Sequence, residues 1–327
     1  MRVAVIGAGL AGAAAARSLM AAGASVTVFD KGRGPGGRLS TRRAETPLGE
    51  MCFDHGAQYV TATSSSFSAF LSAAGDAGVA APWLARLVSI DRAGNVDALR
   101  GEARWVGLPG MSALVKYALN GVEVRQTRRA KRLTGAPGSW TIRFEDGSTE
   151  GPFERIALTL PPEQLVDLLA RSDGDFARVI SGARQVEIAP CWTVMAATEP
   201  GFDPGFDGAK LLGGAVRWMA LTAARPGGAP GGVVLQASPD WSQAFLEHDA
   251  EAVARILCEE VFVRFGMPQP VWSNAHRWRY AMVTTPAGSA ADISDSRTVG
   301  CGGDWRLGGR AECAWDSGEA LGAALLG

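Results

Sequence analysis

The stretch RVAVIGAGLAG, residues 2–12, decides the fold. Its first half, Arg2 to Ile6, is an apolar, β-branched run that is typical of a buried strand. Three glycines follow, and the next segment, Ala13 to Ala22, is rich in the residue with the highest helix propensity. A second apolar run from Ala24 to Phe29 ends at Asp30. The order of strand, glycine turn, helix, strand and acid predicts a dinucleotide-binding βαβ unit in an α/β fold.

Each glycine of this motif has its own physical task. Gly7 permits the tight turn, Gly9 lets the backbone approach a pyrophosphate, and Gly12 lets the helix lie close to the strand. The amides of the first helical turn, around Ala11, then face the phosphates. Asp30 is placed to accept hydrogen bonds from ribose hydroxyls. The alternative is a glycine turn that binds no ligand, and the strand–helix–strand frame argues against it.

The composition restricts the class of protein. The chain has 327 residues, 47% of them hydrophobic and 20% charged, so it has room for one large α/β unit or two interleaved domains. Thirty-two basic residues balance 33 acidic ones, which leaves a net charge of −1 and gives no electrostatic reason to expect nucleic-acid binding. No apolar run approaches the ~20 residues that cross a bilayer. We expect a cytoplasmic protein with no membrane or protein partner.

Cysteine and histidine are scarce and irregularly spaced. The five cysteines are odd in number and show no CxxC pair, so a disulfide framework is not expected. None of the three histidines has zinc-ligand spacing, and we expect no metal.

A second glycine-rich loop, KGRGPGGRLST at residues 31–41, follows Asp30 directly. One βαβ unit needs only one such loop, so the second indicates a longer cofactor that passes over it. The GGRLST stretch at 36–41, together with FDHGAQY at 53–59, resembles the flavoprotein family that contains amine oxidases, phytoene desaturases and renalases. The resemblance implies non-covalent FAD, with Arg38 at the pyrophosphate and residues 56–59 near the isoalloxazine ring. A purely structural ion pair is the alternative for Arg38.

The C-terminal segment predicts a second contact to the same cofactor. Thr298 to Cys301 is a short strand, a Gly302-Gly303-Asp304 turn follows, and Gly308 to Leu326 is rich in alanine and leucine. The resembled family has this GGD–helix arrangement, which would bring Asp304 to the ribityl hydroxyls and the helix start to the flavin. By the same resemblance, Val124 offers backbone atoms to adenine. The expected cofactor-binding residues are therefore Gly7, Gly9, Ala11, Gly12, Asp30, Lys31, Gly37, Arg38, Gly56, Ala57, Gln58, Tyr59, Val124, Gly303 and Asp304.

These segments predict a Rossmann-type FAD-binding domain joined to an α+β substrate domain with a mainly antiparallel sheet, as in amine oxidases and p-hydroxybenzoate hydroxylase. Strand-like runs recur between residues 186 and 280, and a helix is expected at about 249–265. The FAD-binding domain is discontinuous and is expected at residues 1–75, 100–165 and 285–327. The substrate domain is expected at residues 76–99 and 166–284.

The segment HRWRY, residues 276–280, stands out among these runs. Strand alternation puts His276, Trp278 and Tyr280 on one face and the two arginines on the other. One interpretation is an aromatic stripe in the core; the other is a cleft wall that offers a planar side chain and an arginine to a flat, phosphorylated ligand. His276 is a candidate proton carrier, although a lone histidine is more often structural. The expected substrate-binding residues are Arg217, Trp278, Arg279, Tyr280 and His276.

Three reactions are compatible with this family: oxidation of amines, oxidation of dihydropyridines and desaturation of apolar lipids. Four lysines and three tyrosines leave little material for an amine-oxidase site, and the chain is short for a desaturase. Over nearly its whole length the sequence resembles the renalases. That resemblance implies oxidation of 2-dihydro and 6-dihydro isomers of NAD(P)H to β-NAD(P)⁺ by hydride transfer to flavin N5, with O₂ reduced to H₂O₂. The substrate's nitrogen lone pair drives the hydride out, so no acid–base catalytic residue is expected. An amine oxidase is the alternative.

Overall fold

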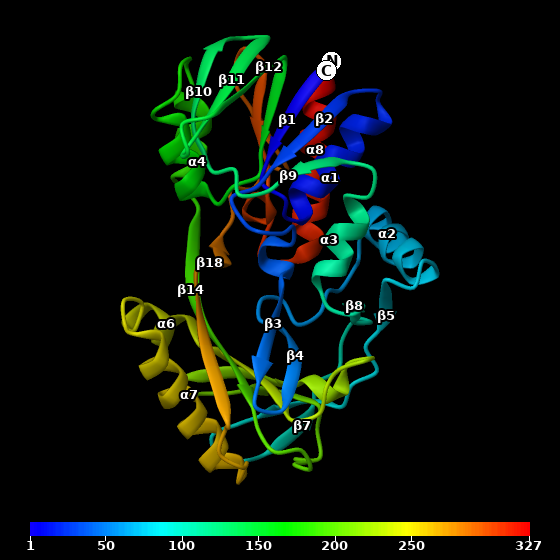
Figure 1. Ribbon diagram of the computed structural model, residues 1–327, viewed down its shortest axis with the longest axis vertical. Helices are drawn as coiled ribbons and strands as arrows, with labels where there is room; N and C mark the ends of the chain where they lie inside the picture. The colour runs from blue at the N-terminus through cyan, green and yellow to red at the C-terminus, as the bar shows by residue number, and fades with distance from the viewer.

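The computed structural model describes all 327 residues, which form two units stacked along the long axis (Figure 1). The upper unit contains a six-stranded sheet in which β1 pairs in parallel with β2 and β13, and only β19 is antiparallel to its neighbour. In spatial order the strands are β19 (Asp292–Ile293), β20 (Val299–Cys301), β13 (Arg155–Leu158), β1 (Arg2–Ile6), β2 (Ser25–Phe29) and β9 (Glu123–Arg125). Segments from both ends of the chain therefore meet in one sheet, as the sequence predicts for a Rossmann-type domain.

Helix α1 (Leu10–Ala21) lies very close to both β1 and α8 (Ala311–Leu326). A Cβ atom at Gly12 would lie 1.9 Å from the carbonyl oxygen of Gly7. A Cβ atom at Gly318 would lie 2.2 Å from the carbonyl oxygen of Ala11. Both contacts are with backbone, which cannot rotate away, so these two positions require glycine.

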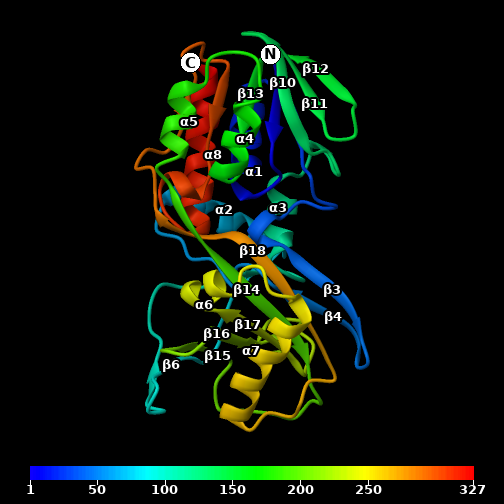
Figure 2. The same cartoon turned by 90° about the vertical axis from the view of Figure 1, so that its left-hand side faces the viewer.

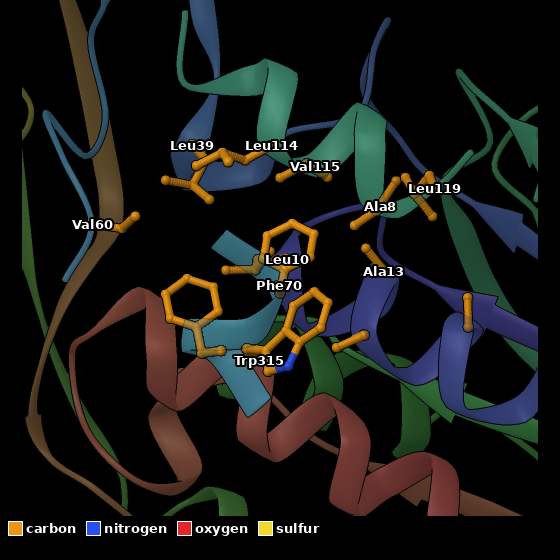
Figure 3. Packing of buried hydrophobic residues seen from close by; sticks show 14 of the residues in the cluster. Ala8, Leu10, Ala13, Leu39, Val60, Phe70, Leu114, Val115, Leu119 and Trp315 are labelled. Atoms are coloured by element: carbon orange, nitrogen blue, oxygen red, sulfur yellow. The ribbon is translucent and has the colours of Figure 1, made fainter. Parts of the chain in front are cut away.

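The first core of the upper unit is built from α1, α8, α2 (Ser65–Asp76) and α3 (Ser112–Ala118). Figure 3 shows Phe70 of α2 and Trp315 of α8 near Leu10, with Leu114 of α3 beside Leu39 in the same cluster. The rings of Phe70 and Trp315 stack with their centroids 4.2 Å apart.

The second core of the upper unit surrounds Trp140 and Phe29. It is covered by a small antiparallel sheet and by two helices, which form part of the upper unit in Figure 2. These elements are β10 (Ala130–Ala136), β11 (Ser139–Phe144), β12 (Thr149–Phe153), α4 (Pro162–Leu169) and α5 (Ala177–Ala183). The expected domain division after residue 165 falls inside α4, and α5 adds Val179 to this core. We propose that the chain leaves the upper unit after α5.

The lower unit is a seven-stranded sheet that is antiparallel except where β15 meets β6. In spatial order its strands are β18 (Trp272–Thr285), β14 (Glu187–Ala197), β17 (Gly232–Ala237), β16 (Val216–Leu221), β15 (Gly208–Leu211), β6 (Leu87–Ile90) and β7 (Val96–Ala98). Helix α7 (Ala250–Phe265) covers one face. The Asp249 carboxylate caps its first turn, and Gly266 with φ +63° ends it. The helix α6 (Pro239–Ala244) packs beside β14.

Long elements connect the two units. Strands β14 and β18 run from the lower sheet toward the upper unit, and the hairpin β3 (Thr41–Thr46) and β4 (Gly49–Asp54) descends opposite them (Figure 1). A short ribbon of β5 (Ala80–Pro82) and β8 (Trp105–Gly107) lies nearby. None of the helices has the length and apolar character needed to cross a membrane. The predicted fold class is confirmed: a Rossmann-type domain carries a second domain built on a mainly antiparallel sheet.

Candidate active site

A cavity of about 1480 Å³ lies between the two units. The two glycine loops of the upper unit form one wall, and side chains of β14, β16, β17 and β18 form another. A pocket for one drug-sized ligand is typically about 300–1,000 Å³. This cavity therefore has room for a dinucleotide and for a second ligand beside it.

The glycine loops leave an open cradle at the start of α1. No atom lies within 4 Å of a Cβ built on Gly9, and Gly37, with φ +55°, approaches the Cα of Gly9 from the second loop. The Asp30 carboxylate accepts hydrogen bonds from the amides of Ala8 (2.7 Å) and Gly32 (2.6 Å) and so joins the two loops. Each carboxylate oxygen keeps a further lone pair for a ribose hydroxyl. The donors and the open space fit a pyrophosphate-containing cofactor.

Arg38 and Asp304 connect the first and last segments of the chain. The guanidinium makes a two-pronged ion pair with the Asp304 carboxylate, in which Nη1 lies 2.7 Å from Oδ2, and Nη1 also donates to the carbonyl of Ala281. The Asp304 side chain is buried, whereas a third of the Arg38 side chain stays exposed on the cavity wall. The structural ion pair considered for Arg38 is therefore present. A phosphate contact by Arg38 stays a prediction.

Two hydrogen bonds hold the expected flavin-facing segment against the lower unit. The indole of Trp278 donates to the carbonyl of His55 at 2.8 Å, and the Gln236 amide donates to the carbonyl of Gly56 at 2.6 Å. Gly56 and Ala57 line the cavity. The lower sheet thus fixes the backbone of the upper unit where the two units meet.

Gln58 and Tyr59, from the same expected segment, face elsewhere. The Gln58 amide donates to the carbonyl of Asp54. The Tyr59 ring lies between Trp83 and Trp218, with centroids 5.8 and 5.9 Å away, and neither Gln58 nor Tyr59 lines the cavity. The Gln58 contact is local, whereas the Tyr59 ring reaches Trp218 of the lower sheet.

Strand β18 presents its side chains in the alternation that the sequence predicts. His276 and Trp278 cluster with His55, and the three ring centroids are 4.4 to 5.1 Å apart. Arg277 and Arg279 both pair with Glu247 on the other side, at 2.9 and 2.6 Å. The aromatic face and both arginines line the cavity.

The two histidines of this cluster are held neutral. Burial, followed by the nearby His276 and Arg42, lowers the pKa of His55 to about 4. Burial and Arg42 also lower the pKa of His276. The Nδ1 atom of His55 is buried without a hydrogen-bond partner in the protein. At neutral pH the ring cluster therefore supplies a polar but uncharged wall.

The cavity brings most of the predicted site residues together. Those on its wall are Gly7, Gly9, Ala11, Asp30, Lys31, Gly37, Arg38, Gly56, Ala57, Gly303, Asp304, Arg217, His276, Trp278, Arg279 and Tyr280. Besides Gln58 and Tyr59, Gly12 and Val124 lie off the wall: Gly12 is covered by Gly7, and Val124 pairs with Val28 in the sheet.

The cavity wall is strongly basic, which the motifs do not predict. Its acidic residues are Asp30, Glu145, Glu163, Asp167 and Asp304. Its fourteen basic residues are Lys31, Arg33, Arg38, Arg42, Arg43, Lys116, Arg128, Arg129, Lys131, Arg171, Arg217, Arg277, Arg279 and Arg310. The whole chain has a net charge of −1, so basic residues are concentrated on this wall. Seven of the fourteen are paired with carboxylates, namely Arg38, Arg128, Arg129, Arg171, Arg277, Arg279 and Arg310. The seven without such a partner still outnumber the wall's two carboxylates that form no ion pair, Asp30 and Glu163.

Comparison with known protein families identifies the family of this chain and its cofactor. Residues 5–74 match the NAD(P)-binding Rossmann-like domain, and residues 83–319 match the flavin containing amine oxidoreductase family. The chain belongs to this flavin-containing amine oxidoreductase family. Its cofactor is FAD, as predicted, and it is an FAD-dependent oxidoreductase.

This flavin-containing oxidoreductase has relatives that match it over nearly its whole length. It is 25% identical to the renalase of Mus musculus over 93% of this chain and 92% of the relative, which confirms the predicted resemblance. Its fold matches a putative protoporphyrinogen oxidase from Exiguobacterium sp. 255-15 (TM-score 0.76, 14% identity, 99% and 98% of the two chains). It also matches cyclohexylamine oxidase from Brevibacterium oxydans IH-35A (TM-score 0.76, 13% identity, 99% and 98%). At these identities the structural likeness shows the fold alone.

Proposed function

We propose that this flavin-dependent oxidoreductase oxidises the 2-dihydro and 6-dihydro isomers of NAD(P)H to β-NAD(P)⁺, with O₂ as the electron acceptor and H₂O₂ as the product. The observation that carries the proposal is the excess of basic over acidic residues on the cavity wall. FAD brings only two phosphates, so the remaining positive charge favours a second phosphorylated ligand. The similarity to a renalase over 93% of the chain supports the same substrate class.

The cofactor would be held by the residues of the open cradle. Gly9 and the amides around Ala11 would face the pyrophosphate, Asp30 the ribose, and Gly56 the ring. FAD, when bound, supplies the hydride acceptor at its N5 atom and passes the electrons on to O₂. All five cysteines are free thiols, and we propose that none of them forms a covalent bond to the cofactor.

The protein's own contribution to this reaction is positioning. Trp278 offers a flat wall for a nicotinamide ring, and Tyr280 and Arg279 follow on the same strand. The dihydropyridine expels hydride with its own nitrogen lone pair, so a neutral wall suffices and no acid or base is required. The uncharged rings of His55 and His276 suit that role. Correct alignment of donor and acceptor then supplies most of the acceleration.

Oxidation of amines is the alternative function, and the cavity charge argues against it. Most amines carry a positive charge at neutral pH, and a wall with seven basic residues that lack a carboxylate partner repels cations. Only Lys31, Lys116 and Lys131 among the lysines reach the cavity, all from the upper unit.

Anaerobic reduction tests the proposal. The oxidised protein is mixed with 6-dihydro-NAD, with 2-dihydro-NAD, or with a panel of primary, secondary and polyamines. The flavin band near ~450 nm should bleach rapidly with the dihydropyridines and persist with the amines. Bleaching by an amine, with no bleaching by either dihydropyridine, would make the proposal wrong.

A further inference from the structure

Two arginines on the cavity wall have no assigned task. Arg42 and Arg43 begin strand β3, directly after the second glycine loop, and both line the cavity. Both are exposed, and neither has a carboxylate within ion-pair distance. Arg277 and Arg279, across the cavity on β18, are by contrast both paired with Glu247. An arginine that lacks a carboxylate partner and faces a cavity is free to bind an anion.

Arg42 lies on the side of the cavity that faces the aromatic cluster. Its positive charge lowers the pKa of both His55 and His276, so it lies near these rings. The β3–β4 hairpin descends opposite β14 and β18, as Figure 1 shows. Strand alternation puts Arg42 and Arg43 on opposite faces of β3, and Arg43 shares its face with Thr41. The face that carries Arg42 is therefore the one turned toward the proposed substrate wall.

Arg217 adds a second guanidinium, from the lower sheet. It lies on β16, and its Nη1 atom is 2.9 Å from the sulfur of Met282, with no carboxylate partner. All five acidic residues of the cavity wall belong to the upper unit. The charged residues that the lower unit contributes to the wall are arginines only.

We propose that Arg42, together with Arg217, forms a phosphate-binding subsite for the pyrophosphate of the nicotinamide dinucleotide, separate from the cradle that holds FAD. This inference rests on the proposed function, because it assigns the substrate of that reaction. Guanidinium groups bind phosphate oxygens in pairs of parallel hydrogen bonds and stay charged at every physiological pH. The subsite anchors the dinucleotide at a distance from the reacting ring and thereby distinguishes it from phosphate-free dihydronicotinamides.

The experiment compares Arg42→Gln, Arg217→Gln and the double variant with the wild-type holoenzyme. Arg143→Gln is the matched control, because Arg143 is an exposed, unpaired arginine on β11 that does not line the cavity. Anaerobic reduction is followed with 6-dihydro-NAD and with 1-methyl-1,6-dihydronicotinamide, which has the same ring and no phosphate. Binding of β-NAD⁺ is measured separately by the perturbation of the flavin spectrum, which needs no turnover.

The double variant should bind 6-dihydro-NAD and β-NAD⁺ about 10- to 100-fold more weakly, the loss expected for one or two charged hydrogen bonds. Its limiting rate of reduction and its reaction with the methyl compound should stay within about 2-fold of wild type. Arg143→Gln should match wild type throughout.

Three results would overturn the subsite: unchanged β-NAD⁺ affinity, an equal loss with both dihydropyridines, or release of FAD from the double variant. A wild-type protein that no dihydropyridine reduces would refute the proposed function instead. In that case β-NAD⁺ binding by the variants would still decide the subsite.

Discussion

Gly9 and Gly12 lie three residues apart, and a methyl group should have opposite effects at the two positions. At Gly12 it would meet the carbonyl oxygen of Gly7 at 1.9 Å, and backbone cannot move aside. At Gly9 it would meet nothing within 4 Å and would instead fill the cradle. Gly12→Ala should lower the free energy of unfolding by about 3 kcal/mol. Gly9→Ala should lower it by less than about 1 kcal/mol while weakening FAD binding at least about 10-fold.

Urea denaturation of the apoproteins and titration with FAD separate these effects. If Gly9→Ala proved as unstable as Gly12→Ala, the first glycine loop would be serving the packing of α1 and not a ligand. Tight FAD binding by Gly9→Ala would place the pyrophosphate elsewhere.

His55 should make the protein less stable in mild acid. Its pKa is lowered from 6.5 to about 4 in the folded state, chiefly by burial. The neutral form is therefore stabilising above pH 6.5, and that stabilisation is lost as the pH falls toward 4. Between pH 7.5 and pH 5 the loss should be about 2 kcal/mol. Unfolding measured across this range should show it as a fall in the urea midpoint.

His55→Asn is the comparison that isolates this residue, because other buried groups titrate too. The Asp54 carboxyl, for example, has its pKa raised by burial and changes stability with the opposite sign. The variant should lose about 2 kcal/mol less than wild type over the same pH interval. Parallel pH profiles for the two proteins would contradict the buried, neutral state of His55.

For whole elements, the close packing of helices α1 and α8 leads to a prediction similar to the one for Gly12. A Cβ at Gly318 would lie 2.2 Å from the carbonyl oxygen of Ala11 and 2.8 Å from the Cβ of Ala14. Gly318→Ala should push the helices apart and lower the free energy of unfolding by about 2 kcal/mol. Because α8 follows Asp304 closely, FAD affinity should fall as well. Ala323→Leu, on the exposed side of α8, should change stability by less than about 0.5 kcal/mol.

Elements with a strong apolar pattern could be predicted from the sequence almost to the residue. Strand β1 occupies Arg2–Ile6 as expected, and α7 begins after Asp249, where a capping acid precedes the helix. The β3–β4 hairpin could not be predicted, because its strand TRRAET, residues 41–46, faces a cavity and alternates only weakly. Helix α2 starts in a serine run that gives no periodicity. Hydrophobic periodicity reports which face of an element is buried in the core, so it does not identify elements whose side chains line a ligand cavity.

Some residues of the candidate site could likewise be predicted from the sequence, and others could not. Residues proposed to contact the cofactor through their backbone or small size can be recognised from the sequence, because the spacing of the glycines specifies the geometry. Arg42, Arg43 and Gln236 reach the cavity only through the hairpin and sheet that place them, and nothing in their local sequence marks them. Tyr59 was expected near the flavin, and its ring packs against two tryptophans off the cavity wall. Outside the glycine motifs, the direction of a side chain depends on the tertiary structure and cannot be predicted from the local sequence.

At the scale of the whole molecule, the distribution of charge matters more than its sum. A net charge of −1 predicts no attraction of anions, yet fourteen basic residues face one cavity with five acidic ones. Clefts lined by one sign of charge focus the field and accelerate the association of oppositely charged ligands. Binding of FAD to the apoprotein should therefore slow about 10-fold between 20 and 500 mM salt, because screening shortens the reach of these charges.

Riboflavin is the matched ligand for this measurement, since it has the same ring and lacks the phosphates. Its association rate, followed by the change in flavin fluorescence in a stopped-flow instrument, should vary by less than about 2-fold over the same range of salt. An equal salt dependence for FAD and riboflavin would mean that salt acts on the apoprotein's conformation and not on ligand capture. A dependence for FAD alone would tie the cavity's positive wall to the capture of phosphorylated ligands, which the proposed substrate and its cofactor have in common.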